Sequence, residues 1–352
     1  MKNITKFLLV LVSSVSLSIA SYAGDMSVTG SVKASYSIGG SDDSTDKGIG
    51  ISNELTFGAS GELDNGFTWN YAMELDGNDG GAHDNDDTQL VIGMGDMGNI
   101  GIYDSEGGLS KELGYGIGAL GTGSDYAGTM TIQYGLDVSN SPNIQYHTGA
   151  GMLPFGLAAK VGFAPNTTDG DNNSYKNTGG INPDSLSGGQ LMHYQVTAAP
   201  IDGLSIGIDY AEGSDTTASI AQDPTSGNYY AQYAFGNFKV GYNRGYYEPG
   251  LVDKDTAITQ YNNEALGIEF AVNDSLSVSF NEETAEKETT AAYVAGATTK
   301  VKTTVESEMD TLQVAYVIGG ATVGIHQLET KNADYLAGKD EKVTIFALEM
   351  EF

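Results

Sequence analysis

The chain has 352 residues, with 46 Asp and Glu against 16 Lys and Arg, a formal net charge of −30 and no cysteine. An acidic surface repels nucleic acid and anionic membrane surfaces, and the lack of thiols excludes a disulfide framework and cysteine metal sites. The 48 glycines and 21 tyrosines, with only 7 prolines, favour a protein of many strands and turns.

The first 23 residues have the layout of a secretory signal peptide. A basic segment, residues 1–6, precedes an apolar run at residues 7–12, and the region ends at Ser21-Tyr22-Ala23. The apolar run is too short for a spanning helix, which needs about 20 apolar residues. We therefore expect export, cleavage after Ala23 and one mature domain, residues 24–352.

Most of the mature sequence alternates between large apolar and small or polar residues. This period of two places one kind of side chain on each face of a β-strand, whereas helical spacing is hard to find. We expect the first strand at residues 26–38, a short fifth strand at 99–103 and the last strand at 344–352. Further alternating stretches are residues 67–75, 157–163, 204–210, 266–272, 276–280 and 312–318.

The connections between these strands fall into two classes that take turns along the chain. Seven are tight turns with Asn-Gly, Gly-Asn or Pro-x-x-Gly sequences, and eight are long and polar, which together join 16 strands. The tight turns are at residues 64–66, 95–98, 149–154, 200–203, 236–237, 273–275 and 319–320. The long loops span residues 39–47, 76–87, 104–129, 165–188, 212–226, 248–263, 282–305 and 331–340.

Short turns at one end and long loops at the other are typical of a transmembrane β-barrel. The barrel must close, because an open edge in hydrocarbon leaves backbone groups unpaired. We therefore expect an all-β, antiparallel up-and-down barrel of about 16 strands, in which the last strand pairs with the first. Aromatic residues near strand ends suit the girdles at the membrane interfaces; they are Phe67, Tyr210, Tyr229, Tyr230, Phe238 and Phe352.

In this organisation the chain resembles the general porins of the Gram-negative outer membrane. The resemblance is carried by the signal peptide, the first strand directly after it, hairpin alternation to the end and the terminal Phe352; residues 141–146 also look like the segment that returns to the wall after the family's long third loop. It implies an outer-membrane barrel among lipid and lipopolysaccharide, usually a homotrimer, that passes small hydrophilic solutes by diffusion. It also implies that the barrel-assembly machinery reads Phe352.

The resemblance further implies that the long third loop folds into the lumen and faces charged residues on the wall. Alternation places four of these on the lumen side: Lys33, Glu74, Lys160 and Lys239. The loop contributes four acidic candidates: Asp104, Glu106, Glu112 and Asp125. Further lumen-side residues are Glu54, His147, His193, Asp209, Glu269, His326, Glu349 and Glu351.

The balance of charge on this wall departs from the family pattern. The general porins carry an arginine cluster there, whereas this chain has a single arginine, Arg244, whose parity points away from the lumen. The anion-attracting half of the field across the pore is therefore weak. We expect a channel that favours cations.

Two acidic loop stretches, residues 76–87 and 169–173, resemble calcium loops only in part. The first has no ligand at its fifth position and no Glu at its twelfth, and the second lacks the central Gly. We expect no cofactor, beyond loosely held Ca²⁺ or Mg²⁺ at the acidic outer loops.

No nucleophile, base and orienting group stand out as a set, so the sequence does not favour an enzyme. Three alternatives to a general diffusion channel stay open. They are a substrate-selective porin with a saturable site, a surface adhesin or receptor that displays acidic loops, and a secreted all-β soluble protein.

Overall fold

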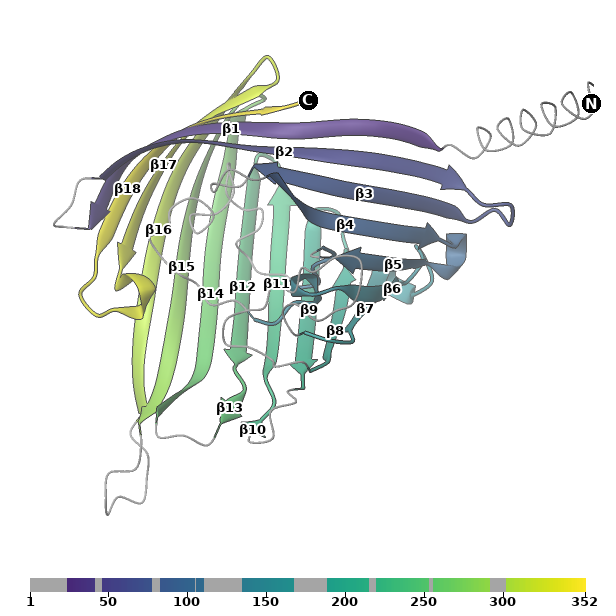
Figure 1. Cartoon of the computed structure of the whole chain (residues 1–352). Helices are drawn as coiled ribbons and strands as arrows, with labels where there is room; N and C mark the ends of the chain where they lie inside the picture. The colour runs from purple at the N-terminus through teal and green to yellow at the C-terminus, as the bar shows by residue number, and fades with distance from the viewer. Residues whose placement is uncertain are drawn as a thin grey trace, which may run out of the picture.

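The computed structural model describes residues 24–41, 46–77, 83–104, 106–110, 135–167, 189–214, 220–252, 256–291 and 302–352. Sixteen antiparallel strands form one closed barrel, in which each strand pairs with the next barrel strand along the chain and β1 also pairs with β18 (Figure 1). This confirms the predicted all-β barrel. Among the described residues, no helix is long and apolar enough to cross a membrane.

All seven expected tight turns join consecutive barrel strands, and the expected fifth strand is present. The barrel strands are β1 (Asp25–Ser41), β2 (Asp46–Glu62), β3 (Thr68–Gly77), β4 (His83–Gly93), β5 (Asn99–Asp104), β6 (Asn143–His147), β7 (Leu157–Ala164), β8 (Leu191–Ala198), β9 (Leu204–Gly213), β11 (Thr225–Phe235), β12 (Phe238–Glu248), β14 (Thr256–Asn273), β15 (Leu276–Ala291), β16 (Lys302–Ile318), β17 (Ala321–Lys331) and β18 (Glu341–Glu351). Short 3-10 helices in the described connections are η1 (Gly95–Met97), η2 (Val138–Asn140), η3 (Pro154–Gly156) and η4 (Ala333–Tyr335).

The seam between β1 and β18 closes the barrel. The two strands pair from Ser31 opposite Glu351 to Ser41 opposite Glu341. Phe352 extends this pairing, because its N–H donates to the Gly30 carbonyl at 2.9 Å and its own carbonyl accepts from the Gly30 N–H at 2.8 Å. Hydrocarbon offers no hydrogen-bond partners, so the seam satisfies the backbone groups that would otherwise be two open edges.

The two faces of the wall carry side chains of opposite exposure. On β18, Phe346, Leu348 and Met350 are exposed, whereas Ile345 and Ala347, at alternate positions, are buried. In a closed transmembrane barrel, the exposed apolar face meets lipid and the other face meets the lumen. We use the term apolar band for the outward-facing apolar side chains near the turn end of the barrel, which include Ile206, Val240, Ile268, Phe280, Val314, Ile325 and Phe346.

Strands β14, β15 and β16 run further than the sequence pattern predicts, into the expected loops 248–263 and 282–305. The reason is visible on β15, where outward-facing Glu282 and Thr284 are polar while Ala285 is fully buried on the inner face. Outside the apolar band, a strand meets water on its outer face and loses the apolar residues that mark a strand in the sequence. Two short strands within expected loops, β10 (Ile220–Gln222) and β13 (Leu251–Val252), also pair with each other.

We expect Leu348→Lys to destabilise the barrel, because it places an ammonium group in the apolar band, where a lysine near the bilayer midplane costs about 2–4 kcal/mol. The matched control is Thr322→Lys, on the inner face of β17 opposite Glu349, which should change the free energy of unfolding by about 1 kcal/mol or less. Urea unfolding in lipid vesicles, followed by heat-modifiable gel mobility, measures both. Equal losses would contradict the assignment of the two faces.

Candidate constriction site

Two stretches of the connection between β5 and β6, residues 106–110 and 135–142, lie against the polar inner wall. We call them the inner segment; residues 111–134 between them lie outside the described residues. Inward-facing side chains of the wall hold its backbone. The amides of Gln145 on β6 and Gln195 on β8 donate to the carbonyls of Gly107 and Leu109, each at 2.5 Å. The inner segment is therefore fixed to the wall at two separate strands.

A third strand, β11, contacts both stretches of the inner segment. The Leu136 N–H donates to the Ser226 hydroxyl at 2.9 Å, and the Asn228 amide donates to the Ser110 hydroxyl at 2.9 Å. The contacts link residues about 90 and 118 positions apart in the chain. The segment thus spans the inner wall from β6 to β11.

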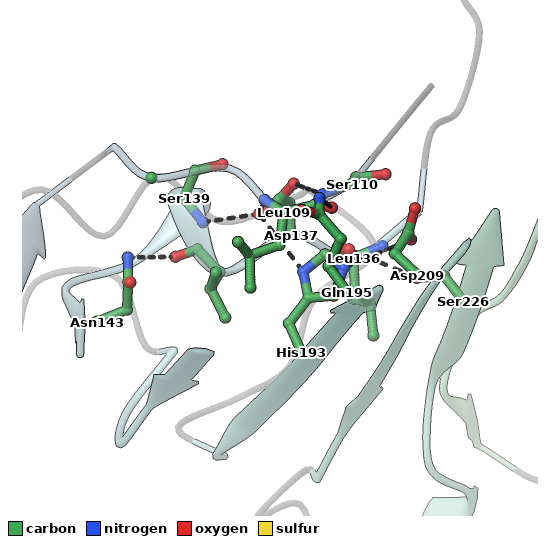
Figure 2. Close-up of polar contacts among 12 residues, drawn as sticks. Leu109, Ser110, Leu136, Asp137, Ser139, Asn143, His193, Gln195, Asp209 and Ser226 are labelled. Carbon is green, nitrogen blue, oxygen red and sulfur yellow. Dashed lines mark hydrogen bonds and ion pairs between the residues drawn. The ribbon is translucent and has the colours of Figure 1, made fainter. Parts of the chain in front are cut away.

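Asp137 joins the two halves of the inner segment. Its carboxylate accepts from the backbone N–H groups of Leu109 at 3.0 Å, Ser110 at 2.6 Å and Ser139 at 3.1 Å (Figure 2). Residues 109–110 and 137–139 are far apart in the chain, and this one side chain joins them directly.

A buried histidine connects Asp137 to the wall. His193 on β8 is fully buried, with its Nδ1 3.5 Å from Asp137 Oδ1 and its Nε2 3.5 Å from Asp209 Oδ1 (Figure 2). Asp209 also accepts from the Asn228 amide at 3.1 Å. The imidazole therefore lies between a carboxylate of the inner segment and a carboxylate of β9.

The electrostatics of Asp137 keep it charged. Burial alone would raise the pKa of this carboxyl, but the nearby His193 and the backbone N–H groups of Ser110 and Ser139 outweigh burial and lower its pKa below the usual value. A carboxyl whose pKa is lowered by folding contributes stability above its unfolded pKa, about 4, and loses it as the pH falls through the folded pKa. The anchor is therefore intact at neutral pH.

Apolar packing adds to these polar contacts. Leu109, Leu136 and Val138 of the inner segment are buried against the wall residues Ala164, Leu191 and Ala211. Burying a leucine or valine side chain contributes about 1.5–3 kcal/mol. Packing and hydrogen bonding together hold the described parts of this connection inside the barrel.

The structure brings two of the candidate acidic residues together. Glu74 on β3 and Glu106 of the inner segment line one small cavity of about 50 Å³, together with Asp87 and Thr56. The Thr56 hydroxyl donates to Glu74 at 3.3 Å, and the Glu106 carboxylate accepts from the Gly107 N–H at 2.8 Å. This corner of the lumen is lined by carboxylates.

Of the other loop candidates, Asp104 is the last residue of β5, opposite Thr88 and with the same parity as outward-facing Ile102. It therefore does not join Glu106 on the inner segment. Glu112 and Asp125 lie outside the described residues.

The three candidate lysines of the wall lie beside acidic or histidine residues. Lys33 on β1 is opposite Glu349 of β18, and Lys239 on β12 is opposite Glu269 of β14. Directly opposed side chains on antiparallel strands have Cβ atoms about 4.5–5.5 Å apart. Lys160 on β7 is opposite His147 of β6. Two of the three lysines thus have a carboxylate at the neighbouring wall position.

Asp137 is the residue that the sequence analysis missed. Its local signal is the Asp-Val-Ser sequence, in which the aspartate caps the N–H two residues later and starts η2. That signal predicts a turn. The partners that give Asp137 its role, Leu109, Ser110 and His193, are distant in the chain, and short-range patterns do not predict them.

Arg244, the single arginine, lies on the outer face of β12. Its side chain is 56% exposed, and its guanidinium is 3.9 Å from Glu264 on β14. Among the described residues, no group of three or more His, Cys, Asp or Glu side chains is arranged to hold a metal ion. The centres of the two calcium-like stretches, residues 78–82 and 169–173, lie outside the described residues.

Comparison with known proteins identifies the family. The family profile described as Gram-negative porin matches residues 7–348, so the chain belongs to the Gram-negative porins. This family has the fold of non-enzymatic channels and places the protein in the outer membrane. No curated protein matches the sequence.

Solved structures share the fold at low sequence identity. An anion-selective porin from Comamonas acidovorans has a TM-score of 0.65 at 14% identity, covering 94% of this chain and all of its own. The trimer form of OmpT from Vibrio cholerae has a TM-score of 0.62 at 14% identity, with coverage of 94% and 100%. OmpF from Salmonella typhi, in complex with daunomycin, has a TM-score of 0.63 at 11% identity, with coverage of 94% and 98%.

We expect Asp137→Asn to loosen the inner segment, because the neutral amide pairs less well with His193 and offers one acceptor oxygen instead of two to the three N–H groups. The cysteine-free chain allows a direct measurement with the pair Ser110→Cys and Asn228→Cys, whose native side chains are in contact. The cysteines should form a disulfide readily in the parent and about tenfold more slowly with Asp137→Asn, since hydrogen bonds to charged groups are worth about 1.5–3 kcal/mol.

The matched control is Asp202→Asn, in the turn before β9, which removes the same charge away from the inner segment. It should leave the cross-linking rate unchanged. An unchanged rate in Asp137→Asn would show that the carboxylate does not anchor the segment.

Proposed function

We propose that this porin is a passive diffusion channel for small hydrophilic solutes and ions, with a preference for cations. The observation that carries the proposal is the charge on the inner face. Inward-facing acidic residues of the described strands include Asp25, Glu54, Glu62, Glu74, Asp87, Asp209, Glu269, Glu283, Glu341, Glu349 and Glu351, against the lysines Lys33, Lys160, Lys239 and Lys287. A lumen lined mainly by carboxylates attracts cations and repels anions.

The sign of selectivity does not follow from the fold. The Comamonas porin is anion-selective and has a similar barrel. In this chain the only guanidinium lies outside the barrel, and two wall lysines are opposite carboxylates. These placements support the cation preference.

We propose that the inner segment and residues 111–134, which connect its two stretches, form the constriction. Glu106 faces Glu74 across a small cavity, and Glu112 and Asp125 belong to the same connection. Asp104, at the start of this connection, has outward parity on β5 and is not part of the proposed constriction. Lys33 on β1 would lie on the wall opposite the inner segment, and Lys160 on β7 and Lys239 on β12 would lie on the wall beside it.

We further propose that residues 1–23 are a signal peptide and residues 24–352 the barrel domain, which acts without enzymatic activity. A homotrimer is supported by the trimer form of OmpT and by strongly exposed apolar residues on β1 and β2, among them Met26, Ile49 and Ile51. The barrel-assembly machinery, outer-membrane lipid and lipopolysaccharide would be its partners.

We expect planar-bilayer reversal potentials in a KCl gradient to show cation preference. The double variant Glu74→Gln and Glu106→Gln should reduce it, because it removes two carboxylates from the lumen, whereas Glu282→Gln on the outer face of β15 should not. Anion selectivity in the parent would overturn the proposal. Saturation of the current by one solute would instead favour a substrate-selective porin.

We expect Phe352→Asp to impair assembly more than conductance, because it places a carboxylate on the exposed outer position that follows Met350 on the seam with β1. The folded fraction in outer-membrane preparations should fall several-fold, while channels that do form should conduct normally. Glu351→Gln, one residue earlier on the inner face, is the control. Normal yields of folded Phe352→Asp would count against a role for Phe352 in assembly.

A further inference from the structure

The last connection of the barrel, residues 332–340 between β17 and β18, packs against the inner face of the wall. Its short helix η4 contacts the loop end of β16 (Figure 1). Within η4, Ala333 is fully buried and Tyr335 is only 9% exposed. A loop that pointed away from the barrel would leave both side chains in water, so protein surrounds this connection on the wall side.

Tyr335 reaches past two strands of the wall. In the barrel, β16 and β15 separate β17 from β14. The Tyr335 ring nevertheless lies 5.6 Å from the ring of Tyr261 on β14, at an interplanar angle of 57°, and Nζ of Lys287 on β15 lies 5.6 Å from its centroid. Tilted aromatic pairs and cations over a ring are both favourable contacts. The ring therefore attaches the last connection to strands that are not its neighbours in the chain.

One wall hydroxyl holds the backbone of the connection at two points. Ser307 on β16 is fully buried; its hydroxyl accepts from the Tyr335 N–H at 3.2 Å and donates to the Asn332 carbonyl at 2.5 Å. The Asn332 side-chain amide also donates to the Glu306 carbonyl at 2.8 Å. These contacts join residues 25 to 28 positions apart in the chain. The connection is thus docked on two consecutive residues of β16.

The backbone of the docked connection is strained. Only four non-glycine residues of the described chain have a positive φ, and three of them are here: Asn332 at 50°, Asp334 at 57° and Tyr335 at 57°. Asn and Asp tolerate this left-handed region, whereas a bulky side chain such as Tyr rarely adopts it. Such a conformation persists only where surrounding contacts hold it. The contacts of the ring and of the N–H group with the wall therefore offset the strain at Tyr335.

The connection is also held together within its own hairpin. Lys339 Nζ lies 2.5 Å from the Asp334 carboxylate and 3.0 Å from that of Glu341, the first residue of β18. The Ala333 N–H donates to the Lys339 carbonyl at 2.7 Å. None of these contacts depends on β14, β15 or β16, so loss of the wall contacts would release the connection as one unit.

We propose that residues 332–340 form a lid over the outer mouth of the channel, and that Tyr335 is the latch that holds this lid against the inner wall. When latched, the lid occupies part of the lumen beside β14, β15 and β16. When released, it relieves the strain at Tyr335 and widens the mouth. The inference rests on the proposed channel function, and it adds a restriction at a different place from the inner segment, which contacts β6 to β11.

The test uses the full-length channel with Ala333→Cys as a reporter thiol, in a chain that has no other cysteine. Two variants break the latch from opposite sides: Tyr335→Asn, which tolerates positive φ but has no ring, and Ser307→Ala, which has no hydroxyl. The matched control is Leu336→Asn, which changes the next residue of the lid, a side chain that is 56% exposed. The measurements are the rate of labelling by a water-soluble maleimide and the single-channel conductance in planar bilayers.

We expect the reporter thiol to be labelled about tenfold faster in Tyr335→Asn and in Ser307→Ala than in the parent, because local opening sets the reaction rate of a buried group. Conductance should rise in both variants. Leu336→Asn should keep the parental labelling rate and conductance. Tyr335→Phe, which retains the ring, should be labelled as slowly as the parent.

Three results would overturn the proposal: parental labelling in Tyr335→Asn, faster labelling without a rise in conductance, or equal changes in Leu336→Asn. Heat-modifiable gel mobility identifies the variants that fold, and if Tyr335→Asn does not fold, Ser307→Ala decides by the same criteria. Failure of the parent to conduct would contradict the channel function instead, so the two failures are distinguishable.

Discussion

Closure of the backbone hydrogen-bond ring is the constraint on which the rest of this structure depends. Hydrocarbon cannot satisfy a free N–H or C=O group, so a sheet is stable there only when its first and last strands meet. In this chain the meeting strands are β1 and β18, from the two ends of the sequence, and the pairing continues to Phe352. The register of this seam fixes which residues are neighbours across it, including Lys33 and Glu349. A long-range constraint therefore sets part of the electrostatics of the lumen.

Once the ring is closed, alternation along each strand assigns every strand side chain to the outer face or to the lumen. The inner face can then carry polar side chains along its whole length, and its buried side chains pack against residues from inside the barrel. Between β6 and β11 these residues come from the inner segment, where Leu109 and Val138 are fully buried and Asp137 connects both halves to His193. The wall and the inner segment thus stabilise each other.

The sequence analysis was accurate where a local rule decides the structure. Asn-Gly and similar pairs marked the turns, and period-two alternation marked strands that cross the apolar band, so 16 strands and their order could be predicted. The same rule failed on β15 beyond Phe280, because Glu282, Thr284 and Glu286 face water and resemble a loop in the sequence. It also could not predict the role of Asp137, because the partners of this residue come from β8 and from the other half of the inner segment. Pairings between residues distant in the chain are decided by the closed ring and not by any short pattern.

The position of the single arginine shows that the alternation of side chains along a strand sets both the charge of the lumen and the charge of the outer face. With a single arginine in the chain, parity alone decides whether the guanidinium faces ions or lipid, and Arg244 shares its face with Tyr242 and Tyr246. An inward position would have added a strong anion-attracting charge to a wall where lysines lie beside carboxylates. The outward position leaves the inner wall without a guanidinium and puts the single one on the outer face, beside Glu264. Because a shift of register by one residue would exchange the two faces, ion preference and lipid contact are tied to the same strand pairing, that of β12 with β11 and β14.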